Sequence, residues 1–367
     1  MSAPDMLTHA DIPFSLADIN KEWLTEALRE NGIIRQESVI DFSHHMIGAE
    51  AGFNGDVAIL QLQYSDPHTE APESMVLKIP TASKNRIQGQ TMGLYEKEIR
   101  FYRDLNPLLN IRSPAHYYSA LDIADDPDVV LERMQGLNKL PMWLIAVLTK
   151  LARWLIAKTP RRYVLLIEDL SGYRIGDQMQ GCSDEDARRV LRAIASLHGQ
   201  FWESEQLASM SWIMPVTLTS KIIHMIFLQS IGKFRAANEY QLSDRQGQII
   251  DWVTENGIAL TEKLGEEPAT LLHGDVRLDN ICFDDDSQDV LLFDWQTMQR
   301  GPAGMDLAYF LSAAMPIEAD ESRINALIAF YHGQLQANGV EISLSRLRWQ
   351  YELAMLSIVH RILPVLY

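Results

Sequence analysis

The sequence is poor in cysteine and in long hydrophobic runs, and each shortage excludes a class of protein. Cys182 and Cys282 are the only two cysteines, which argues against a disulfide-rich secreted domain, and we expect both to be reduced thiols. No uncharged run reaches the roughly 18 residues that a membrane-spanning helix requires. The N-terminal residues lack the basic and apolar regions of a secretory signal. We therefore expect a cytoplasmic protein.

Basic residues are also in short supply. Lysine and arginine number 32 against 49 aspartates and glutamates, which gives a net charge of −17. This charge repels the phosphates of nucleic acids, so we expect no nucleic-acid partner. It is compatible with a cationic small molecule. The hydrophobic content of 47% and the length of 367 residues suit a globular protein with two lobes of ordinary size.

β-type patterns occupy the first part of the chain and helical patterns the second. Helices are expected in the first part at residues 15–32 and 89–105. Strands are expected at residues 37–47, 56–64, 74–80, 115–121 and 163–167, with an extra strand at 128–134. Further helices are expected at residues 183–202, 218–239, 243–264, 318–339 and 343–366.

This order of elements is typical of a bilobed α+β protein. We expect a β-rich N-terminal, nucleotide-binding lobe over residues 1–168 and a mostly helical C-terminal, catalytic and substrate-binding lobe over residues 169–367. A cleft between two such lobes is the natural place for a site.

Lys78 stands in the middle of a predicted strand, between apolar residues. A mid-strand lysine is costly to bury without a partner. It therefore either lies on an exposed sheet face or binds a phosphate with an acid beside it. The helix predicted next offers Glu96 and Glu98, and Glu98 is the better inward-facing candidate because it lies beside the apolar Ile99 and Tyr102.

Glycines recur in the turn between the first two predicted strands, at Gly48, Gly52 and Gly55. The backbone amides of such a turn can approach a phosphate closely. A hairpin turn accounts for glycine equally well, so both interpretations stay open.

An apolar, basic segment interrupts the β-rich part at about residues 123–162. Within it, residues 141–158 predict an amphipathic helix, and the stretch from Lys139 to Ile167 carries six basic residues and no acidic one. We favour a helix packed on the N-terminal lobe or in a homodimer interface, so the chain is expected to be a monomer or a homodimer. The less favoured alternatives are contact with a membrane surface through residues 141–158 and a cover for a lipophilic substrate.

The stretch Leu271–Phe310 carries the chemistry. A hairpin with strands at residues 281–283 and 290–293 is expected to hold Asn280 and Asp294 near each other across its open end. One amide oxygen and one carboxylate can then share a magnesium ion, whose other positions go to phosphate oxygens and water. Asp275 stands apart and can accept a proton from a hydroxyl. The acidic residues of the turn, 284–289, are expected to be solvated.

This stretch resembles the catalytic core of the aminoglycoside phosphotransferase and choline kinase superfamily, which shares the protein-kinase fold. Within that superfamily the chain is most similar to the ecdysteroid-kinase-like and related bacterial small-molecule phosphotransferases. The resemblance rests on HGDVRLDN, LLFDWQ, GPAGMDLAYFL, IEDLSG, EKEIRFY, VLKIP and LHGQFW, which run in family order over about residues 47 to 311.

The resemblance implies a role for each matching position in the use of ATP and Mg²⁺. Asp275 would orient or deprotonate the substrate hydroxyl, and Arg277 would occupy the place of the lysine that touches the γ-phosphate in protein kinases. Asn280 and Asp294 would hold Mg²⁺.

The remaining implied roles concern the nucleotide. Lys78 would bind the α- and β-phosphates with Glu98 as its partner, Gly52 and Gly55 would cover the phosphates, and the backbone from Glu168 to Leu170 would hydrogen-bond adenine. Outside these roles, His273 and Asp306 are expected to be structural.

The predicted function is ATP- and Mg²⁺-dependent phosphorylation of a hydroxyl group on a small molecule. Only eleven residues separate Asp294 from Asp306, which leaves no room for a regulated activation loop and argues against a protein substrate. The apolar segment favours a lipophilic alcohol such as a steroid or a hydroxyacyl compound. The alternatives are an aminoglycoside or choline-type kinase acting on a cationic substrate, and a nucleotide-binding pseudokinase.

Overall fold

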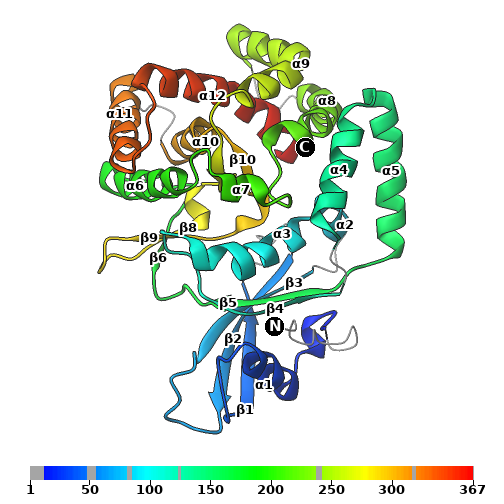
Figure 1. Cartoon of the computed structure of the whole chain (residues 1–367), viewed down its shortest axis with the longest axis vertical. Helices are drawn as coiled ribbons and strands as arrows, with labels where there is room; N and C mark the ends of the chain where they lie inside the picture. The colour runs from blue at the N-terminus through cyan, green and yellow to red at the C-terminus, as the bar shows by residue number, and fades with distance from the viewer. Residues whose placement is uncertain are drawn as a thin grey trace. The chain divides into compact units, whose positions relative to one another are not determined.

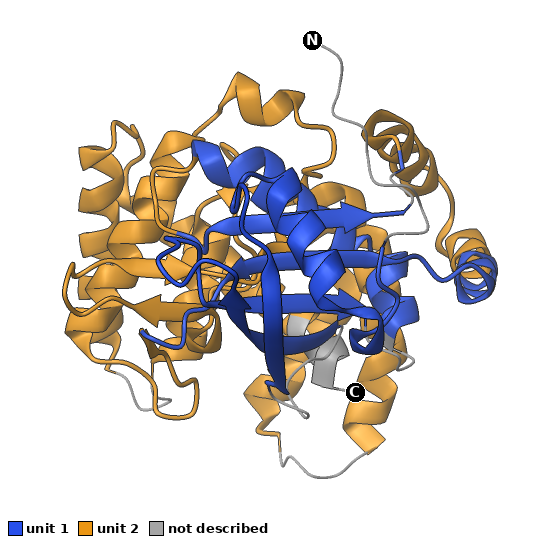
Figure 2. Ribbon diagram, turned by 90° about the horizontal axis from the view of Figure 1, so that it is seen from below, with its two compact units in different colours: residues 1–108, 113–125, 150–172 blue, residues 109–112, 126–149, 173–367 orange. Residues whose placement is uncertain are grey.

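The computed structural model describes residues 12–47, 55–80, 85–122, 125–236, 242–315 and 320–366. The chain divides into two compact units, coloured separately in Figure 2. The first unit comprises residues 1–108, 113–125 and 150–172, and the second comprises residues 109–112, 126–149 and 173–367.

The first unit is built on a five-stranded antiparallel sheet in the order β1-β2-β3-β5-β4 (Figure 1). Its strands are β1 (Val39–Met46), β2 (Gly55–Tyr64), β3 (Ser74–Pro80), β4 (His116–Leu121) and β5 (Tyr163–Glu168). These strands confirm the five predicted strands of the lobe. Along β3 buried and partly exposed positions alternate, as expected for a sheet that is more deeply covered on one face.

Helix α1 (Lys21–Glu30) covers that sheet with an apolar stripe. Its Leu24 and Leu28 are fully buried and belong to the same hydrophobic cluster as Leu60, Leu77 and Leu166 of the sheet. The single helix predicted over residues 15–32 is wrong at its start. The chain forms a short 3₁₀ turn at Leu16–Asp18, and α1 then begins anew because the Asn20 side chain accepts a hydrogen bond from the Trp23 amide at 2.8 Å.

The helix predicted over residues 89–105 is divided into α2 (Asn85–Thr91), α3 (Leu94–Arg100) and a π-helical turn (Phe101–Leu105). Gly93 lies between the first two with φ +64°, a left-handed conformation that ends a helix and that glycine adopts without steric cost. The extra strand predicted at residues 128–134 is wrong. That segment lies in helix α4 (Pro127–Asn138), because the Asp126 side chain caps the amides of Asp128 and Val129 and Pro127 fits the first helical turn.

The second unit is mostly helical, as predicted. Its longer helices are α6 (Asp184–Gln200), α8 (Ser220–Ala236), α9 (Asp244–Leu264), α10 (Gly304–Ala314), α11 (Glu321–Ala337) and α12 (Leu344–Leu366), with the short α7 (Glu205–Ser209) between α6 and α8. Helix α12 packs against α8, α9 and α10, and α11 packs against α6 (Figure 1).

Two small sheets lie among these helices. The strands β8 (Ile281–Phe283) and β9 (Val290–Leu292) form the predicted hairpin, and β6 (Arg174–Ile175) extends it. The second sheet pairs β7 (Thr270–Leu272) with β10 (Gln299–Gly301). Strand β7 therefore ends directly before His273, and β10 returns beside it.

Helix α5 (Met142–Lys158) confirms that a helix forms where one was predicted over residues 141–158. Within the described ranges no helix combines the length and the apolar character needed to cross a membrane. Cys182 and Cys282 do not form a disulfide, as predicted.

Two buried histidines meet between α8 and α12. His224 Nδ1 and His360 Nε2 are 3.0 Å apart, and Gly257 of α9 lies against both rings, where a Cβ atom would come within 2.8 Å of each. Burial lowers the pKa of His360 to about 3 and also lowers the pKa of His224. Both rings are therefore kept neutral in the folded chain.

This pair makes the folded state sensitive to acid. An unfolded histidine has a pKa of about 6.5, so below that pH the unfolded chain binds protons that the folded pair does not, and stability falls as pH drops. Protonation of His360 in the unfolded chain should by itself lower the free energy of unfolding by about 2 kcal/mol when the pH falls from 7 to 5. Denaturant unfolding at both pH values would show this loss in the wild type and in the control variant His44→Gln, an exposed position, but a smaller loss in His360→Phe. An equal loss in all three would contradict it.

Candidate functional site

In the first unit Lys78 and Glu98 form an ion pair, with Lys78 Nζ 2.5 Å from Glu98 Oε1. The lysine lies on β3 opposite Val57 and Leu165, and the glutamate lies on α3. The Lys78 side chain is 14% exposed and that of Glu98 is 4% exposed, so the charges offset each other's burial. The geometry supports the choice of Glu98, because Glu96 pairs instead with Arg100 along the helix. Phosphate binding by Lys78 stays a prediction.

Of the two glycines predicted to cover phosphates, the structure describes one. Gly52 lies outside the described residues. Gly55 begins β2 opposite Pro80, and a Cβ atom there would lie 2.9 Å from the Tyr163 hydroxyl and 3.1 Å from the Ile79 carbonyl oxygen. Close packing therefore accounts for glycine at position 55 without a nucleotide, and its role toward phosphate stays a prediction.

The segment predicted to bind adenine follows β5. The Glu168 amide donates to the Ala115 carbonyl at 2.9 Å, and the Glu168 carboxylate accepts from the Ala115 amide at 3.0 Å. Asp169 accepts hydrogen bonds from the Ser74 hydroxyl and the Ser171 amide, and Leu170 is buried. The segment is thus held firmly against its neighbours, and its contact with adenine stays a prediction.

In the second unit a buried aspartate anchors the loop that follows β7. Asp306, near the start of α10, is 1% exposed. Its two carboxylate oxygens accept hydrogen bonds from the amides of His273 and Gly274, at 2.8 and 3.0 Å. Gly274 has φ +83°, and a Cβ atom there would lie 2.5 Å from the Thr297 carbonyl oxygen, so only glycine fits. The backbone of the loop is therefore fixed where it reaches the next residue, Asp275.

The ring of His273 fixes the same loop from the other side. The Asp275 amide donates to His273 Nδ1 at 3.3 Å, so the proton of the neutral ring lies on Nε2, which donates to the Phe293 carbonyl at 3.0 Å. Complete burial lowers the pKa of His273, which keeps the ring neutral although Asp306 and Asp275 act in the opposite sense. These contacts support the structural interpretation of His273 and Asp306.

Asp275 is held through both of its carboxylate oxygens. The Tyr309 hydroxyl donates to Oδ1 at 2.7 Å, and the Asn280 side-chain amide donates to Oδ2 at 3.0 Å. Arg277 Nε lies 3.6 Å from Oδ2, beyond hydrogen-bond distance but within range of charge attraction. Sequence reasoning missed Tyr309. It belongs to the quoted GPAGMDLAYFL segment and lies three residues, one helical turn, after Asp306, which was the available signal.

The β8–β9 hairpin places Asn280 and Asp294 at its open end, as expected. The Phe293 amide donates to the Asn280 carbonyl at 3.1 Å, so Asp294 follows a residue bonded directly to Asn280. The Asn280 amide nitrogen is turned toward Asp275, which turns its amide oxygen away from that carboxylate. The second unit therefore brings Asp275, Arg277, Asn280 and Asp294 together.

Asp294 has a left-handed backbone with φ +66° and ψ +62°, which is uncommon for a residue other than glycine. Its neighbours impose this conformation. The buried Trp295 donates from Nε1 to the Leu292 carbonyl at 3.0 Å, and Gln296 Nε2 donates to Asp294 Oδ1 at 2.5 Å. Strained residues of this kind occur often at functional sites, where the surrounding structure holds them in place.

The donor set fits Mg²⁺, which prefers oxygen ligands and commonly takes only one or two carboxylates from the protein. Asp294 supplies a carboxylate and Asn280 an amide oxygen. Clusters of three or more histidine, cysteine or acidic side chains suited to a metal do not occur among the described residues. Two such oxygen ligands leave the other positions of a bound Mg²⁺ to phosphate and water.

The turn between β8 and β9 differs from the prediction of a merely solvated loop. Arg112 pairs with Asp284 at 2.5 Å, and both Arg174 and Arg189 pair with Asp285, at 2.8 and 2.7 Å. Hydrogen bonds from Arg174 and Arg189 hold the pKa of Asp285 well below its usual range. These arginines come from distant parts of the sequence, and they fix the far end of the hairpin that carries Asn280 and Asp294.

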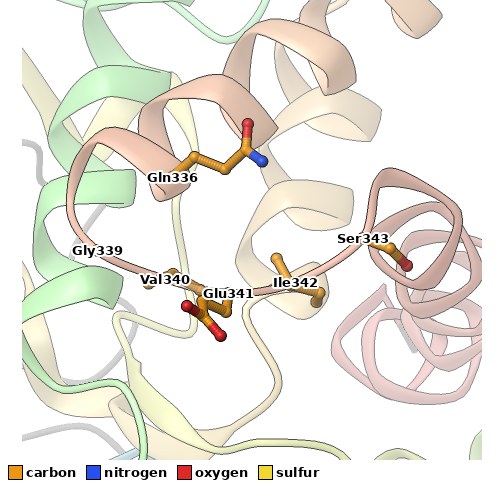
Figure 3. A pocket seen from close by; sticks show the side chains of 6 residues that line it. All are labelled: Gln336, Gly339, Val340, Glu341, Ile342 and Ser343. Carbon is orange, nitrogen blue, oxygen red and sulfur yellow. The ribbon is translucent and has the colours of Figure 1, made fainter.

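A surface pocket lies at the turn between α11 and α12 (Figure 3). It is lined by Gln336, Gly339, Val340, Glu341, Ile342 and Ser343. None of these residues belongs to the loop around Asp275 or to the hairpin. The pocket is therefore not part of the arrangement around Asp275.

The strained backbone at Asp294 leads to a stability test. At a left-handed position Asp294→Gly should be more stable than Asp294→Ala by about 1 kcal/mol, because alanine retains the steric clash of a Cβ atom. The same two substitutions, to glycine and to alanine, at Asp251 should show the opposite order. Asp251 is an exposed position within α9, and there the alanine variant should be more stable by about 1 kcal/mol. Denaturant unfolding of the four variants measures both differences, and the same order at both positions would contradict the assignment.

Solved structures are similar to the chain at low sequence identity. A choline kinase from Cryptosporidium parvum is 12% identical, with a TM-score of 0.53 over 97% of this chain and 86% of that chain. A macrolide 2′-phosphotransferase of type I is 14% identical, with a TM-score of 0.49 over 97% of this chain and 93% of that chain. The first similarity shows a protein-kinase-like fold, as predicted. No curated protein sequence matches the chain significantly.

The family model of the ecdysteroid kinase-like family matches residues 51–343, which is most of the chain. The matched range includes Lys78, Glu98 and the whole stretch from Leu271 to Phe310, and it agrees with the resemblance read from the sequence. The chain belongs to the ecdysteroid kinase-like family of small-molecule phosphotransferases.

Proposed function

We propose that the protein transfers the γ-phosphoryl group of ATP, in the presence of Mg²⁺, to a hydroxyl of a small lipophilic alcohol. The observation that carries this proposal is the arrangement around Asp275. A carboxylate held by Tyr309 and Asn280 lies on a loop anchored by Asp306, and Asn280 is bonded through its backbone to the residue before Asp294. The reaction is ATP + R–OH → ADP + R–O–PO₃²⁻ + H⁺.

Asp275 acts on the acceptor. Its carboxylate accepts a hydrogen bond from the alcohol, orients the oxygen toward the γ-phosphorus and takes the proton as the new O–P bond forms and the bond to the β-phosphate oxygen breaks. Burial and the charge of Asp275 raise the pKa of the Tyr309 hydroxyl well above its ordinary value, so Tyr309 keeps its proton and remains a donor to Asp275. The catalytic carboxylate is thereby held in one orientation.

Asn280 and Asp294 would hold Mg²⁺ through their side-chain oxygens. When bound, the ion neutralises charge on the transferring phosphoryl group. Arg277, whose side chain is 43% exposed beside Asp275, would contact the γ-phosphate. Its guanidinium also offsets the negative charge of Asp275.

The first unit supplies the groups assigned to the rest of the nucleotide. Lys78, positioned by Glu98, would bind the α- and β-phosphates. Gly52 and Gly55 would cover the phosphates, and the backbone at Glu168 and Leu170 would hydrogen-bond adenine.

Two acceptor classes each have support. The family name points to steroid alcohols, and a steroid or hydroxyacyl compound also suits the apolar segment around α5. The net charge of −17 favours a cationic acceptor such as an amino alcohol or an aminoglycoside. We favour the lipophilic class. A pseudokinase is disfavoured because Lys78, Asp275, Asn280 and Asp294 are present together.

An ADP-release screen across hydroxylated steroids, hydroxyacyl compounds, amino alcohols and antibiotics tests the proposal. We expect turnover with a lipophilic alcohol, and a loss of about 10³-fold or more in Asp275→Ala and in Asp294→Ala. Asp294→Ala should also abolish the Mg²⁺-dependent rise in melting temperature that ATP causes, because it removes a metal ligand, while Asp275→Ala should keep that rise.

The variant Asp286→Ala, in the exposed turn of the same hairpin, is the matched control and should keep both activity and nucleotide binding. ATP-dependent phosphorylation that persists in Asp275→Ala would disprove the role of that residue. An ATP-induced shift that survives both EDTA and Asp294→Ala would disprove the metal assignment.

Tyr309→Phe tests how Asp275 is held. Loss of a hydrogen bond to a charged group should lower kcat about tenfold, since the carboxylate is no longer fixed, while KM for ATP stays unchanged. Tyr64→Phe removes a comparable buried tyrosine bond, to the Pro72 carbonyl in the first unit, and should leave kcat unchanged. A fall in kcat of equal size in both variants would point to general destabilisation instead.

A further inference from the structure

Helix α5 leaves most of its apolar surface uncovered. Of its residues only Ile145 is buried, whereas Trp143 is 69% exposed and Trp154 is 55% exposed. Val147, Leu151 and Leu155 are each more than half exposed. Two tryptophans and three aliphatic side chains on one helix form an exposed apolar patch, and large patches of this kind mark interaction sites. The predicted packing of this helix on the N-terminal lobe does not account for them.

The exposed apolar residues share one face of α5. At about 100° per residue, positions 143, 147, 151, 154 and 155 fall within roughly a third of the helix circumference. Ile145, on the opposite side, is the residue that the protein buries. The helix therefore turns its apolar residues both toward the protein and away from it.

Basic side chains accompany this outward face. Lys150 lies at one edge of it, and Arg153 lies about 60° further round the helix on the same side. Lys158 lies within the face, and its ammonium is 3.4 Å from the centre of the Trp154 ring. All three are exposed, and in the described part of the chain none of them forms an ion pair. In a protein of net charge −17, α5 itself contains no acidic residue. The face is thus apolar and cationic at once.

Both ends of α5 are fastened. Before its first residue, the carbonyls of Asn138 and Leu140 accept hydrogen bonds from Lys221 Nζ of α8 at 2.6 and 3.1 Å. After its last residue, the Thr159 carbonyl accepts from Gln90 of α2 at 3.0 Å, and Arg161 pairs with Asp125 at 2.9 Å. The helix is held as a formed element, so its outward face can bind without a prior folding step.

Charge distinguishes two possible partners of this face, a second copy of the chain and a lipid surface. A second copy of the chain docked through α5 would bring its own Lys150, Arg153 and Lys158 toward the same cations, which is unfavourable. An anionic lipid surface offers acyl chains for the apolar residues and phosphate headgroups for the cations. Tryptophan is enriched at this boundary because its ring is apolar and its N–H is polar.

We propose that the outward face of α5 docks the protein onto an anionic lipid bilayer. The helix lies parallel to the membrane plane along a length of about 25 Å. Trp143, Val147, Leu151, Trp154 and Leu155 enter the boundary between headgroups and acyl chains. Lys150, Arg153 and Lys158 bind lipid phosphates. The proposal does not depend on the identity of the phosphate acceptor.

Vesicle co-sedimentation of the full chain tests this. We expect binding to phosphatidylcholine vesicles that contain phosphatidylglycerol, and binding weaker by on the order of a hundredfold to pure phosphatidylcholine, because three cations lose their partners. Raised salt should weaken the first binding strongly and the second little. These measurements use the wild type alone and so do not rely on any variant folding.

Variants then assign the face. Trp143→Glu/Trp154→Glu should lower vesicle affinity at least about tenfold, and Lys150→Gln/Arg153→Gln/Lys158→Gln should remove the preference for anionic lipid. The matched control Leu228→Glu/Trp252→Glu adds two carboxylates at exposed apolar positions of α8 and α9 and should bind like the wild type. Far-UV circular dichroism and melting temperature verify that all variants are folded.

Three results would overturn the proposal. Wild-type protein that fails to bind anionic vesicles excludes a membrane partner. Equal binding by the wild type and Trp143→Glu/Trp154→Glu places the contact elsewhere. A wild-type dimer, seen by analytical ultracentrifugation, that this double variant converts to a monomer while no vesicle binding occurs assigns the face to a second copy of the chain.

Discussion

The candidate catalytic loop depends on one buried carboxylate. Asp306 would be costly to bury as an isolated charge. Its oxygens instead accept the amide hydrogens of His273 and Gly274, and Oδ2 lies 3.3 Å from His198 Nε2. His198 in turn contacts the Tyr331 hydroxyl at 2.5 Å, so the loop is connected through Asp306 to α6 and α11. Hydrogen bonds to an ionised group are the strong ones, and here they convert a flexible glycine-containing loop into a fixed platform for Asp275.

The same loop is connected to the hairpin from two directions. His273 donates to the carbonyl of Phe293, and Asn280 accepts from the amide of that residue. The residue before Asp294 is therefore hydrogen-bonded to both ends of the loop that carries Asp275. The arginines at the far turn of the hairpin complete the support, so the proposed metal ligands lie on an element held at both ends.

Much of the fold could be predicted because it follows from local patterns. Strand β3 alternates in burial along most of its length, and the hairpin at residues 281–292 has two apolar strands on either side of a polar turn, so local patterns located both. The secondary-structure predictions failed where a local sequence pattern conflicted with another local interaction. Valines at 129 and 130 suggested a strand, but the cap at Asp126 and the proline after it made a helix. Gly93 divided a long apolar pattern into two helices because its left-handed backbone cannot continue either one.

The sequence by itself determined the family, the order of the elements and the types of side chain that phosphoryl transfer needs, since these are carried by short motifs with fixed spacing. It also singled out Glu98 over Glu96, because a helix face is set by periodicity. Only the tertiary structure revealed Tyr309 on Asp275, the arginines on the acidic turn and the uncovered face of α5. Each of these depends on which distant segments meet, or fail to meet, and a local pattern carries no information about that.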